Sequence, residues 1–204
     1  MFDIMHRRPL AGLVAAGLFA LTATGAASAL AAEPAPNDGL NATYWTQKAV
    51  EFKANAYGQY MLAQVRLEQA LADKSWTALP GEQASGYESL PTAVILDLDE
   101  TVMDNSGYQA WVVKTNGHYS SKTWTPYVNS ETSGAVPGSL EFIKFAQSKG
   151  VAIFYISNRK DHEEKATIAN LKKLGYPVAD DGSNVLVRGE KEEWKKSAKS
   201  PRRM

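Results

Sequence analysis

The chain has 204 residues, of which 44% are hydrophobic and 22% are charged, and this is the composition of an ordinary globular domain. Cysteine is absent, which excludes a disulfide framework, a cysteine zinc site and a thiol nucleophile, and three histidines are too few for a multi-histidine metal cage. Basic and acidic residues both number 22, so the overall charge gives no support to nucleic acid as a partner.

Residues 1–31 have the layout of a secretory signal peptide. Arg7 and Arg8 precede an apolar run over residues 10–21, and small residues follow, with Ala-x-Ala sites that end at Ala29 and Ala31. A membrane-spanning helix needs about 20 apolar residues, and this run is shorter. We therefore expect cleavage and a periplasmic or secreted protein, without a lipid-bearing cysteine; an uncleaved membrane anchor is the alternative.

A long helix is predicted behind a linker over residues 32–42. It starts at Thr43, which can cap it, and runs to about Ala72. Its apolar residues recur at steps of three and four and form one stripe, which we expect to face the core rather than a ligand: Trp45, Ala49, Phe52, Ala56, Tyr60, Ala63, Leu67 and Ala70.

The rest of the chain alternates short aliphatic runs with helical stretches. The runs over residues 93–96, 151–156 and 184–187 do not alternate apolar with polar residues, which is typical of strands buried on both faces of a parallel sheet. Helices are expected over 138–149 and 160–174. The order predicts an α/β domain over residues 43–204 with a doubly wound parallel sheet, an N-terminal helix and a small, aromatic-rich lid insert at about 104–136.

Polar side chains follow the first two predicted strands. Asp97 and Asp99 come directly after the first strand and Ser157 after the second, and ligands of open parallel sheets bind at this edge. Two carboxylates two residues apart point to the same side of an extended backbone and repel each other unless a cation or a shared proton compensates. A hard divalent ion, most simply Mg²⁺, fits such a pair. An Asp-x-Asp motif alone also occurs in metal-dependent glycosyltransferases and in acidic turns.

Several motifs together resemble one family. The segment Val94-Ile95-Leu96-Asp97-Leu98-Asp99-Glu100-Thr101 resembles the first motif of the haloacid dehalogenase (HAD) superfamily of phosphohydrolases, and Ile156-Ser157-Asn158-Arg159 resembles its second motif. The segments 104–108 and 122–124 are similar to bacterial class C acid phosphatases, a family that includes 5'-nucleotidase lipoproteins of the outer membrane. The resemblance extends over residues 41–203 and implies the HAD-like fold.

The resemblance also implies a mechanism. Asp97 would attack phosphorus and form an aspartyl phosphate, and Asp99 would protonate the leaving oxygen and then activate water. Mg²⁺ would bind the Asp97 carboxylate and the Asp99 backbone carbonyl. The segment 196–202 is similar to the third motif and selects Lys199 as the cation that neutralises nucleophile and phosphate; a solvated basic tail is the alternative.

Four residues are candidates for substrate binding: Thr101, Ser157, Asn158 and Trp124. The Ser157 hydroxyl would bind a phosphate oxygen, or cap the helix expected at residue 160. Trp124 would stack on the base of a nucleotide, or pack within the lid. The resemblance implies a small phosphomonoester as substrate, including nucleoside monophosphates, and turnover at acid pH. A homodimer is one candidate assembly of the chain.

The sequence departs from the family pattern at its end. The family's fourth motif carries further aspartates for Mg²⁺ after the third-motif lysine, and here the last aspartates are Asp180 and Asp181, which we interpret as turn formers. We therefore expect a truncated member in which the strand before Asp97 has an unpaired edge and activity is weak or absent. A catalytically impaired relative that binds nucleotide, or an interaction protein, is the alternative function.

Overall fold

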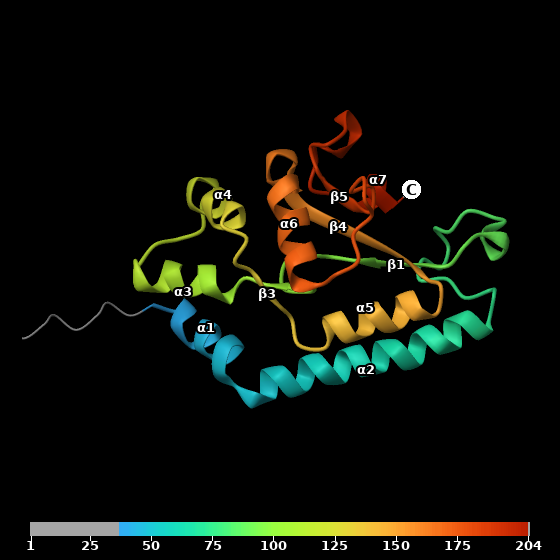
Figure 1. Cartoon of the computed structure of the whole chain (residues 1–204), viewed down its shortest axis with the longest axis horizontal. Helices are drawn as coiled ribbons and strands as arrows, with labels where there is room; N and C mark the ends of the chain where they lie inside the picture. Colours follow the sequence, from blue (N-terminus) through green and yellow to red (C-terminus); the bar gives the residue numbers. More distant parts are fainter. Residues whose placement is uncertain (1–36, 204) are drawn as a thin grey trace, which may run out of the picture. The chain divides into compact units, whose positions relative to one another are not determined.

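The computed structural model describes residues 37–203, which fall in one compact unit over residues 35–204 (Figure 1). The predicted signal peptide and residues 32–36 of the predicted linker lie outside the described residues, whereas residues 39–42 of that linker are helical, so the first helix starts before Thr43. In the described part, no helix combines the length and the apolar character that crossing a membrane requires.

Two helices stand where the sequence predicts one. Helix α1 spans Gly39–Lys48 and helix α2 spans Val50–Ala72. Ala49 between them adopts φ −68° and ψ 130°, an extended conformation that ends α1 before α2 begins. The predicted core-facing stripe holds within α2, where Leu67 is buried, but Trp45 in α1 is 46% exposed. The break explains the difference, because residues on either side of it no longer share one helical face.

The central sheet has three parallel strands in the order β1-β4-β5, which confirms the predicted parallel α/β architecture. Strand β1 spans Ala93–Leu96, β4 spans Ala152–Lys160 and β5 spans Val185–Arg188. Within residues 37–203, β1 pairs only with β4, and Ile95 is 44% exposed. The strand that leads into Asp97 therefore lies at an edge of the described sheet.

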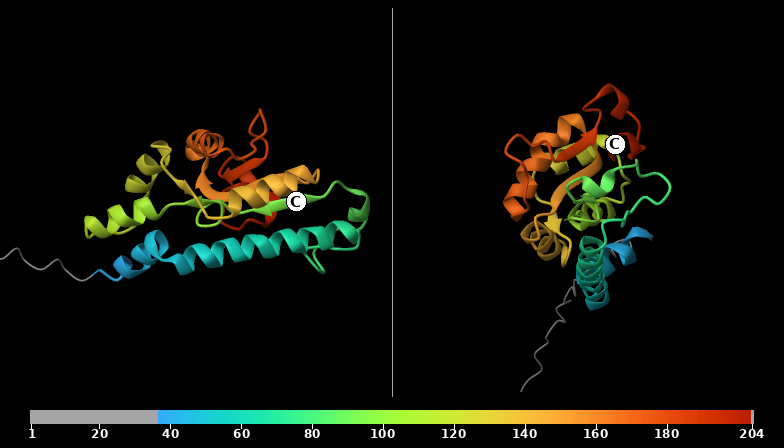
Figure 2. Two further views of the ribbon diagram at one scale, coloured as in Figure 1. Left: turned by 60° about the horizontal axis from the view of Figure 1, so that its bottom comes forward. Right: turned by 90° about the vertical axis from the view of Figure 1, so that its right-hand side faces the viewer.

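Helices α5 and α6 connect the strands. Helix α5 spans Ser139–Ser148, begins after Gly138 at φ 85°, and lies alongside α2 (Figure 2). Helix α6 spans Glu164–Leu174 and ends at Gly175, also at φ 85°, a left-handed conformation that glycine adopts without strain. Between the layers lies one apolar core that includes Leu96, Leu98, Val102, Met103, Phe142, Ile143, Tyr155, Leu171, Val185 and Val187.

Strand β4 is longer than predicted, and this changes the start of the next helix. It continues through residues 157–160, with an irregular register against β5 between Ile156 and Lys160. A 3-10 turn, η2, follows over Asp161–Glu163, so α6 begins four residues later than expected. The polar residues of the second motif thus lie within the strand rather than in a loop behind it.

The segment between β1 and α5 forms a small substructure beside the sheet. Strand β2 (Met103–Asp104) pairs antiparallel with β3 (Gly134–Ala135), and helices α3 (Ser106–Lys114) and α4 (Ser121–Asn129) lie between them in the chain. Helix α1 packs against α3, and α4 contacts α6 (Figures 1 and 2). We call residues 103–135 the α3–α4 segment.

Three short elements complete the described chain. The turn η1 (Tyr87–Ser89) lies in the connection from α2 to β1, and η3 (Glu192–Trp194) follows β5. Helix α7 (Ser200–Arg203) is the last element. Asp180 and Asp181 lie in a turn before β5, where the Asp181 carboxylate accepts a hydrogen bond from the Ser183 amide, which confirms their interpretation as turn formers.

Candidate active site

Asp97 and Lys199 meet at the carboxyl end of β1. Lys199 Nζ lies 2.5 Å from Asp97 Oδ1, and the Leu98 amide donates to the same oxygen at 2.8 Å. The side chains of Lys199 and Asp97 are 29% and 42% exposed, so the pair lies at the surface and is open to a ligand. The C-terminal basic segment is therefore docked on the site rather than solvated as a free tail.

Asp99 is held by a buried arginine. Arg159, whose side chain is 1% exposed, donates a hydrogen bond from Nε to Oδ1 of Asp99 at 2.9 Å, and its Nη2 forms an ion pair with the same oxygen at 2.8 Å. Asn105 Nδ2 donates to that oxygen at 3.0 Å, whereas Oδ2 receives only the Ser157 hydroxyl, at 3.3 Å. Among the described residues, Oδ1 is thus held by two hydrogen bonds and an ion pair, whereas Oδ2 has one long hydrogen bond.

Arg159 also links this carboxylate to the α3–α4 segment. Its Nη2 donates to Asn105 Oδ1 at 3.2 Å and its Nη1 to Thr167 Oγ1 at 3.2 Å, and its guanidinium carbon lies 5.5 Å from the ring centre of Trp124. A buried charge needs such partners, because burial without them is costly. Arg159 was not among the predicted site residues; its position in the second motif, next to Ser157 and Asn158, was the available signal.

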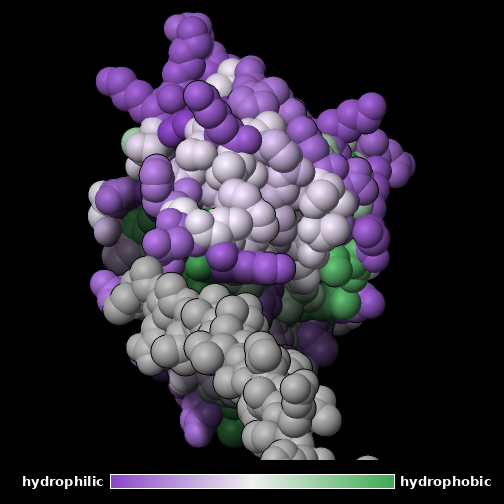
Figure 3. All heavy atoms as spheres, turned by 90° about the vertical axis from the view of Figure 1, so that its left-hand side faces the viewer, coloured by the Kyte–Doolittle hydropathy of each residue, from purple (hydrophilic) through white to green (hydrophobic). Residues whose placement is uncertain are grey.

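Aromatic side chains surround Trp124. Its ring centre lies 5.0 Å from that of Tyr108, 5.5 Å from Tyr127 and 5.9 Å from Tyr119. Figure 3 shows the end of the molecule that carries α3 and α4, where pale and purple residues prevail and green patches are small. Tyrosine and tryptophan combine large apolar faces with polar atoms, so this surface can contact a planar group.

Ser157 forms hydrogen bonds with both Asp99 and Arg159. It is fully buried, donates to Asp99 and accepts from the Arg159 amide at 3.0 Å. Because β4 continues past it, Ser157 does not cap a helix at residue 160, so that alternative is wrong. Asn158 is exposed, and its Oδ1 accepts from Arg202 Nη2 at 2.7 Å.

Thr101 lies in the turn that faces α2. Its carbonyl oxygen accepts a 2.5 Å hydrogen bond from the Tyr60 hydroxyl, and together with Glu100 it lines a cavity of about 340 Å³ against α2. The structure thus brings Asp97, Asp99, Ser157 and Lys199 to one edge of the sheet, whereas Thr101 faces the other side of its turn.

Burial shifts the pKa of Glu100 in this turn and of Tyr60, which contacts the turn from α2. Desolvation, followed by the charge of Asp99, raises the pKa of Glu100, although the Asn105 amide donates to its carboxylate at 3.1 Å. Burial raises the pKa of Tyr60 to about 12, with a smaller contribution from Tyr176. Both groups therefore favour their neutral forms more than they would in water.

The carboxylates fit a hard cation with few protein ligands. The described residues hold no cluster of three or more histidine, aspartate or glutamate side chains suited to a metal. Both contacts of the Asp97 carboxylate fall on Oδ1, which leaves Oδ2 for a ligand. Mg²⁺ often takes one or two carboxylates and keeps several waters, so Asp97 Oδ2 with the Asp99 backbone carbonyl is a donor set that suits it.

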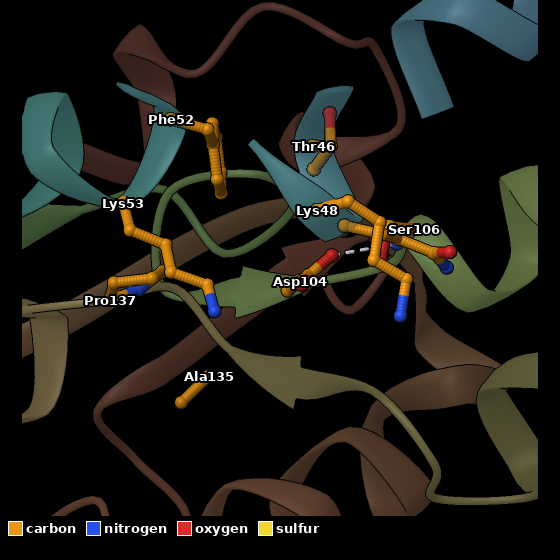
Figure 4. A pocket seen from close by; sticks show the side chains of 9 residues that line it. Thr46, Lys48, Phe52, Lys53, Asp104, Ser106, Ala135 and Pro137 are labelled. Carbon is orange, nitrogen blue, oxygen red and sulfur yellow. Dashed lines mark hydrogen bonds between the residues drawn. The ribbon is translucent and has the colours of Figure 1, made fainter. Parts of the chain in front are cut away.

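A second cavity, of about 450 Å³, lies between the α1–α2 junction and the β2–β3 pair. In Figure 4, Asp104 appears between the side chains of Lys48 and Lys53, and its carboxylate accepts from the Ser106 amide at 2.7 Å. Neither Asp97 nor Lys199 lines this cavity, so it is separate from the carboxylate site.

Comparison with known proteins agrees with this geometry. Residues 22–204 match the family model described as HAD superfamily, subfamily IIIB (acid phosphatase). The chain is similar to the crystal structure of class C acid phosphatase from Bacillus anthracis with tungstate bound, at 40% identity and a TM-score of 0.67 over 81% of this chain and 62% of that one. A second structure of class C acid phosphatase from Bacillus anthracis matches at 40% identity and a TM-score of 0.66, over 81% of this chain and 61% of that one. The chain thus spans about three fifths of the length of these relatives. Since the family model covers most of its residues, the chain belongs to the acid phosphatases of HAD subfamily IIIB.

Proposed function

We propose that this chain is an exported, Mg²⁺-dependent phosphatase that hydrolyses phosphomonoesters through an aspartyl phosphate. The observation that carries the proposal is the contact of Lys199 with Asp97, because a carboxylate can attack an anionic phosphate only where a cation offsets the repulsion. Family membership and the similarity to a structure with bound tungstate support it.

In the first step Asp97 is the nucleophile. A carboxylate oxygen forms a bond to phosphorus, the bond from phosphorus to the ester oxygen breaks, and the leaving alcohol takes a proton from Asp99. Oδ2 of Asp99 suits this transfer, since its one hydrogen bond within residues 37–203 is the 3.3 Å contact with Ser157. Arg159 and Asn105 keep the other oxygen in place.

In the second step water hydrolyses the aspartyl phosphate. Asp99, now ionised, accepts a proton from the attacking water, and the bond between phosphorus and the Asp97 oxygen breaks to release phosphate. Lys199 stays beside the nucleophile and neutralises the charge of the bound phosphoryl group. A bound Mg²⁺, held by Asp97 and the Asp99 carbonyl, would supply Lewis-acid stabilisation of phosphoryl oxygens.

The aromatic surface around Trp124 favours nucleoside monophosphates among phosphomonoesters. Tyr108 and Tyr127 pack around Trp124, and Arg159 connects this cluster to Asp99. A base stacked there would lie on the segment that is tied to the catalytic carboxylate. The residues that bind substrate in this proposal are Ser157, Asn158 and Trp124, with Thr101 shaping the turn.

Phosphate release by the purified chain tests the proposal. We expect p-nitrophenyl phosphate to be hydrolysed at acid pH, activity to disappear with a chelator and to return with Mg²⁺, and Asp97→Asn to be inactive while its circular dichroism spectrum is unchanged. Equal phosphate release by wild type and Asp97→Asn would show that Asp97 is not the nucleophile.

Nucleotide binding without turnover is the second candidate. It is favoured by the aromatic cluster around Trp124, which can contact a base whether or not the ester is hydrolysed. Titration calorimetry with a nucleoside monophosphate, with and without Mg²⁺, separates the two. Saturable binding by a folded sample that releases no phosphate supports the second candidate, and turnover rejects it.

A further inference from the structure

Arg202 is buried next to the candidate active site and has no part in the mechanism above. It is 3% exposed although it belongs to α7, the last element of the described chain. A long cationic side chain is rarely buried unless partners satisfy it. Its neighbour in the chain, Arg203, is exposed and contacts only the Ser200 hydroxyl, at 3.1 Å, so burial is specific to residue 202.

The guanidinium of Arg202 donates hydrogen bonds to two residues of β4. Nη1 donates to the Ser157 carbonyl oxygen, and Nη2 donates to Asn158 Oδ1 at 2.7 Å. These two acceptors belong to the second motif, and Ser157 itself contacts Asp99. Burial lowers the pKa of Arg202 and Arg188 adds to this, whereas the charge of Asp97 opposes it.

The same side chain also holds the segment that carries Lys199. Nη2 lies 3.4 Å from the carbonyl oxygens of Ser197 and Ala198, and the Arg202 amide donates to the Lys199 carbonyl at 3.0 Å. Arg202 therefore joins the backbone on both sides of Lys199 to β4. The Trp194 indole also donates to the Pro201 carbonyl at 3.1 Å, but this contact leads to the end of β5, so Arg202 is the connection from this segment to β4.

We propose that Arg202 is a positioning residue that fixes the Lys199 ammonium on Asp97 by fastening residues 197–202 to Ser157 and Asn158 of β4. The last turn of the described chain then makes two contacts, through Lys199 with Asp97 directly after β1 and through Arg202 with Asn158 on β4. The role of Lys199 in turnover rests on the proposed function, but its placement by Arg202 does not. Displacing a catalytic group by about 1 Å can cost about 100-fold in rate.

The chemical reactivity of Lys199 tests this placement without any substrate. The full chain is acylated with a limiting amine-reactive ester, and peptide mass spectrometry follows Lys199, with the exposed Lys195 as internal reference. The variants are Arg202→Gln, Arg202→Lys and Asn158→Ala, with Arg203→Gln as the matched control. Asn158 is exposed, so Asn158→Ala keeps the test valid even if removal of the buried arginine unfolds the chain.

We expect Lys199 in Arg202→Gln to react about tenfold faster relative to Lys195, and about threefold faster in Asn158→Ala, since hydrogen bonds to charged groups are lost. Arg202→Lys keeps the positive charge but cannot donate to both Ser157 and Asn158 as the guanidinium does, so Lys199 should also react faster in this variant. In Arg203→Gln, the reactivity of Lys199 should match wild type. Equal Lys199 reactivity in wild type, Asn158→Ala and Arg202→Lys would overturn the proposal.

Turnover then separates this inference from the proposed function. If the wild type is active, kcat of Arg202→Lys should fall about tenfold or more with a smaller change in KM, because the transition state depends on the cation more than binding does. An active Arg202→Lys with wild-type kcat would contradict the role in catalysis. If the wild type releases no phosphate while Lys199 becomes more reactive in the variants, the positioning stands and the proposed function fails.

Discussion

Arg159 donates a hydrogen bond from Nε to one oxygen of Asp99 at 2.9 Å and pairs with the same oxygen through Nη2 at 2.8 Å, while its own side chain is almost completely removed from solvent. The other oxygen of Asp99 is left with one long contact, to Ser157. The two carboxylate oxygens therefore differ, and one is structural while the other is open to chemistry. The same arginine lies 5.5 Å from Trp124, so the site and the aromatic cluster share one cation.

Replacement of Arg159 by methionine should destabilise the protein. Asp99, Asn105 and Thr167 would lose their common donor, and an acid that is 25% exposed would lose its counter-charge. Breaking a buried ion pair costs about 3–5 kcal/mol. Urea denaturation should show a loss of this order, whereas Lys149→Met, which removes a surface pair with Glu68, should cost less than about 1 kcal/mol. A similar loss in both variants would contradict this account of the pair.

Replacement of Lys199 by methionine should impair catalysis rather than folding. Its ammonium is the cation nearest Asp97, and loss of one preorganised electrostatic contact typically lowers kcat by about 10²–10³. Steady-state kinetics with p-nitrophenyl phosphate measure the loss. Lys195→Met, which removes an exposed pair with Glu192, is the matched control and should keep wild-type kinetics. A Lys199→Met enzyme with unchanged kcat/KM would remove Lys199 from the mechanism.

Tyr60 should contribute to alkaline unfolding. Its pKa in the folded chain is about 12 against 10.0 for the free group, so below pH 10 both states keep the proton and stability is unaffected. Between pH 10 and about 12 the unfolded chain loses this proton and the folded chain does not, so stability falls as pH rises. Thermal melts of Tyr60→Phe should show a shallower decline in this range, while the exposed Tyr44→Phe should follow wild type. Identical slopes in all three proteins would exclude this contribution.

Replacement of Trp124 by alanine should affect substrates with a base more than substrates without one. Stacking of a base on an aromatic ring contributes about 1–3 kcal/mol, so KM for a nucleoside monophosphate should rise while KM for glycerol phosphate changes little. The comparison of two substrates in one variant controls for a general disturbance of the α3–α4 segment. An equal rise for both substrates would indicate that Trp124 only packs against Tyr108 and Tyr127.

The sequence alone predicted much of the framework. Uninterrupted aliphatic runs indicated parallel strands, because a strand covered on both faces has no polar side, and β1 begins and ends at the predicted residues. The predicted helix end at residue 174 is also correct, because Gly175 adopts a left-handed φ that glycine tolerates without strain. The acids at the end of β1 and the hydroxyl on β4 were found because strand order and direction place them at one edge.

Features that depend on distant segments were not visible in the sequence. The single predicted N-terminal helix is broken at Ala49, because packing of α1 on α3 and of α2 on α5 overrides a continuous helical pattern. The periodicity of an isolated segment also could not show that β4 extends through Lys160, since that extension depends on pairing with β5.

The charges of the site were decided by the tertiary structure. The resemblance assigned Lys199 as the cation beside the nucleophile Asp97, but the sequence did not indicate which cation pairs with Asp99. Folding pairs Lys199 with Asp97 and Arg159 with Asp99, and it buries Arg202 between β4 and the segment that carries Lys199. The physical reason is that a local pattern specifies the backbone, whereas the partner of a long charged side chain is set by the three-dimensional arrangement of elements far apart in the chain.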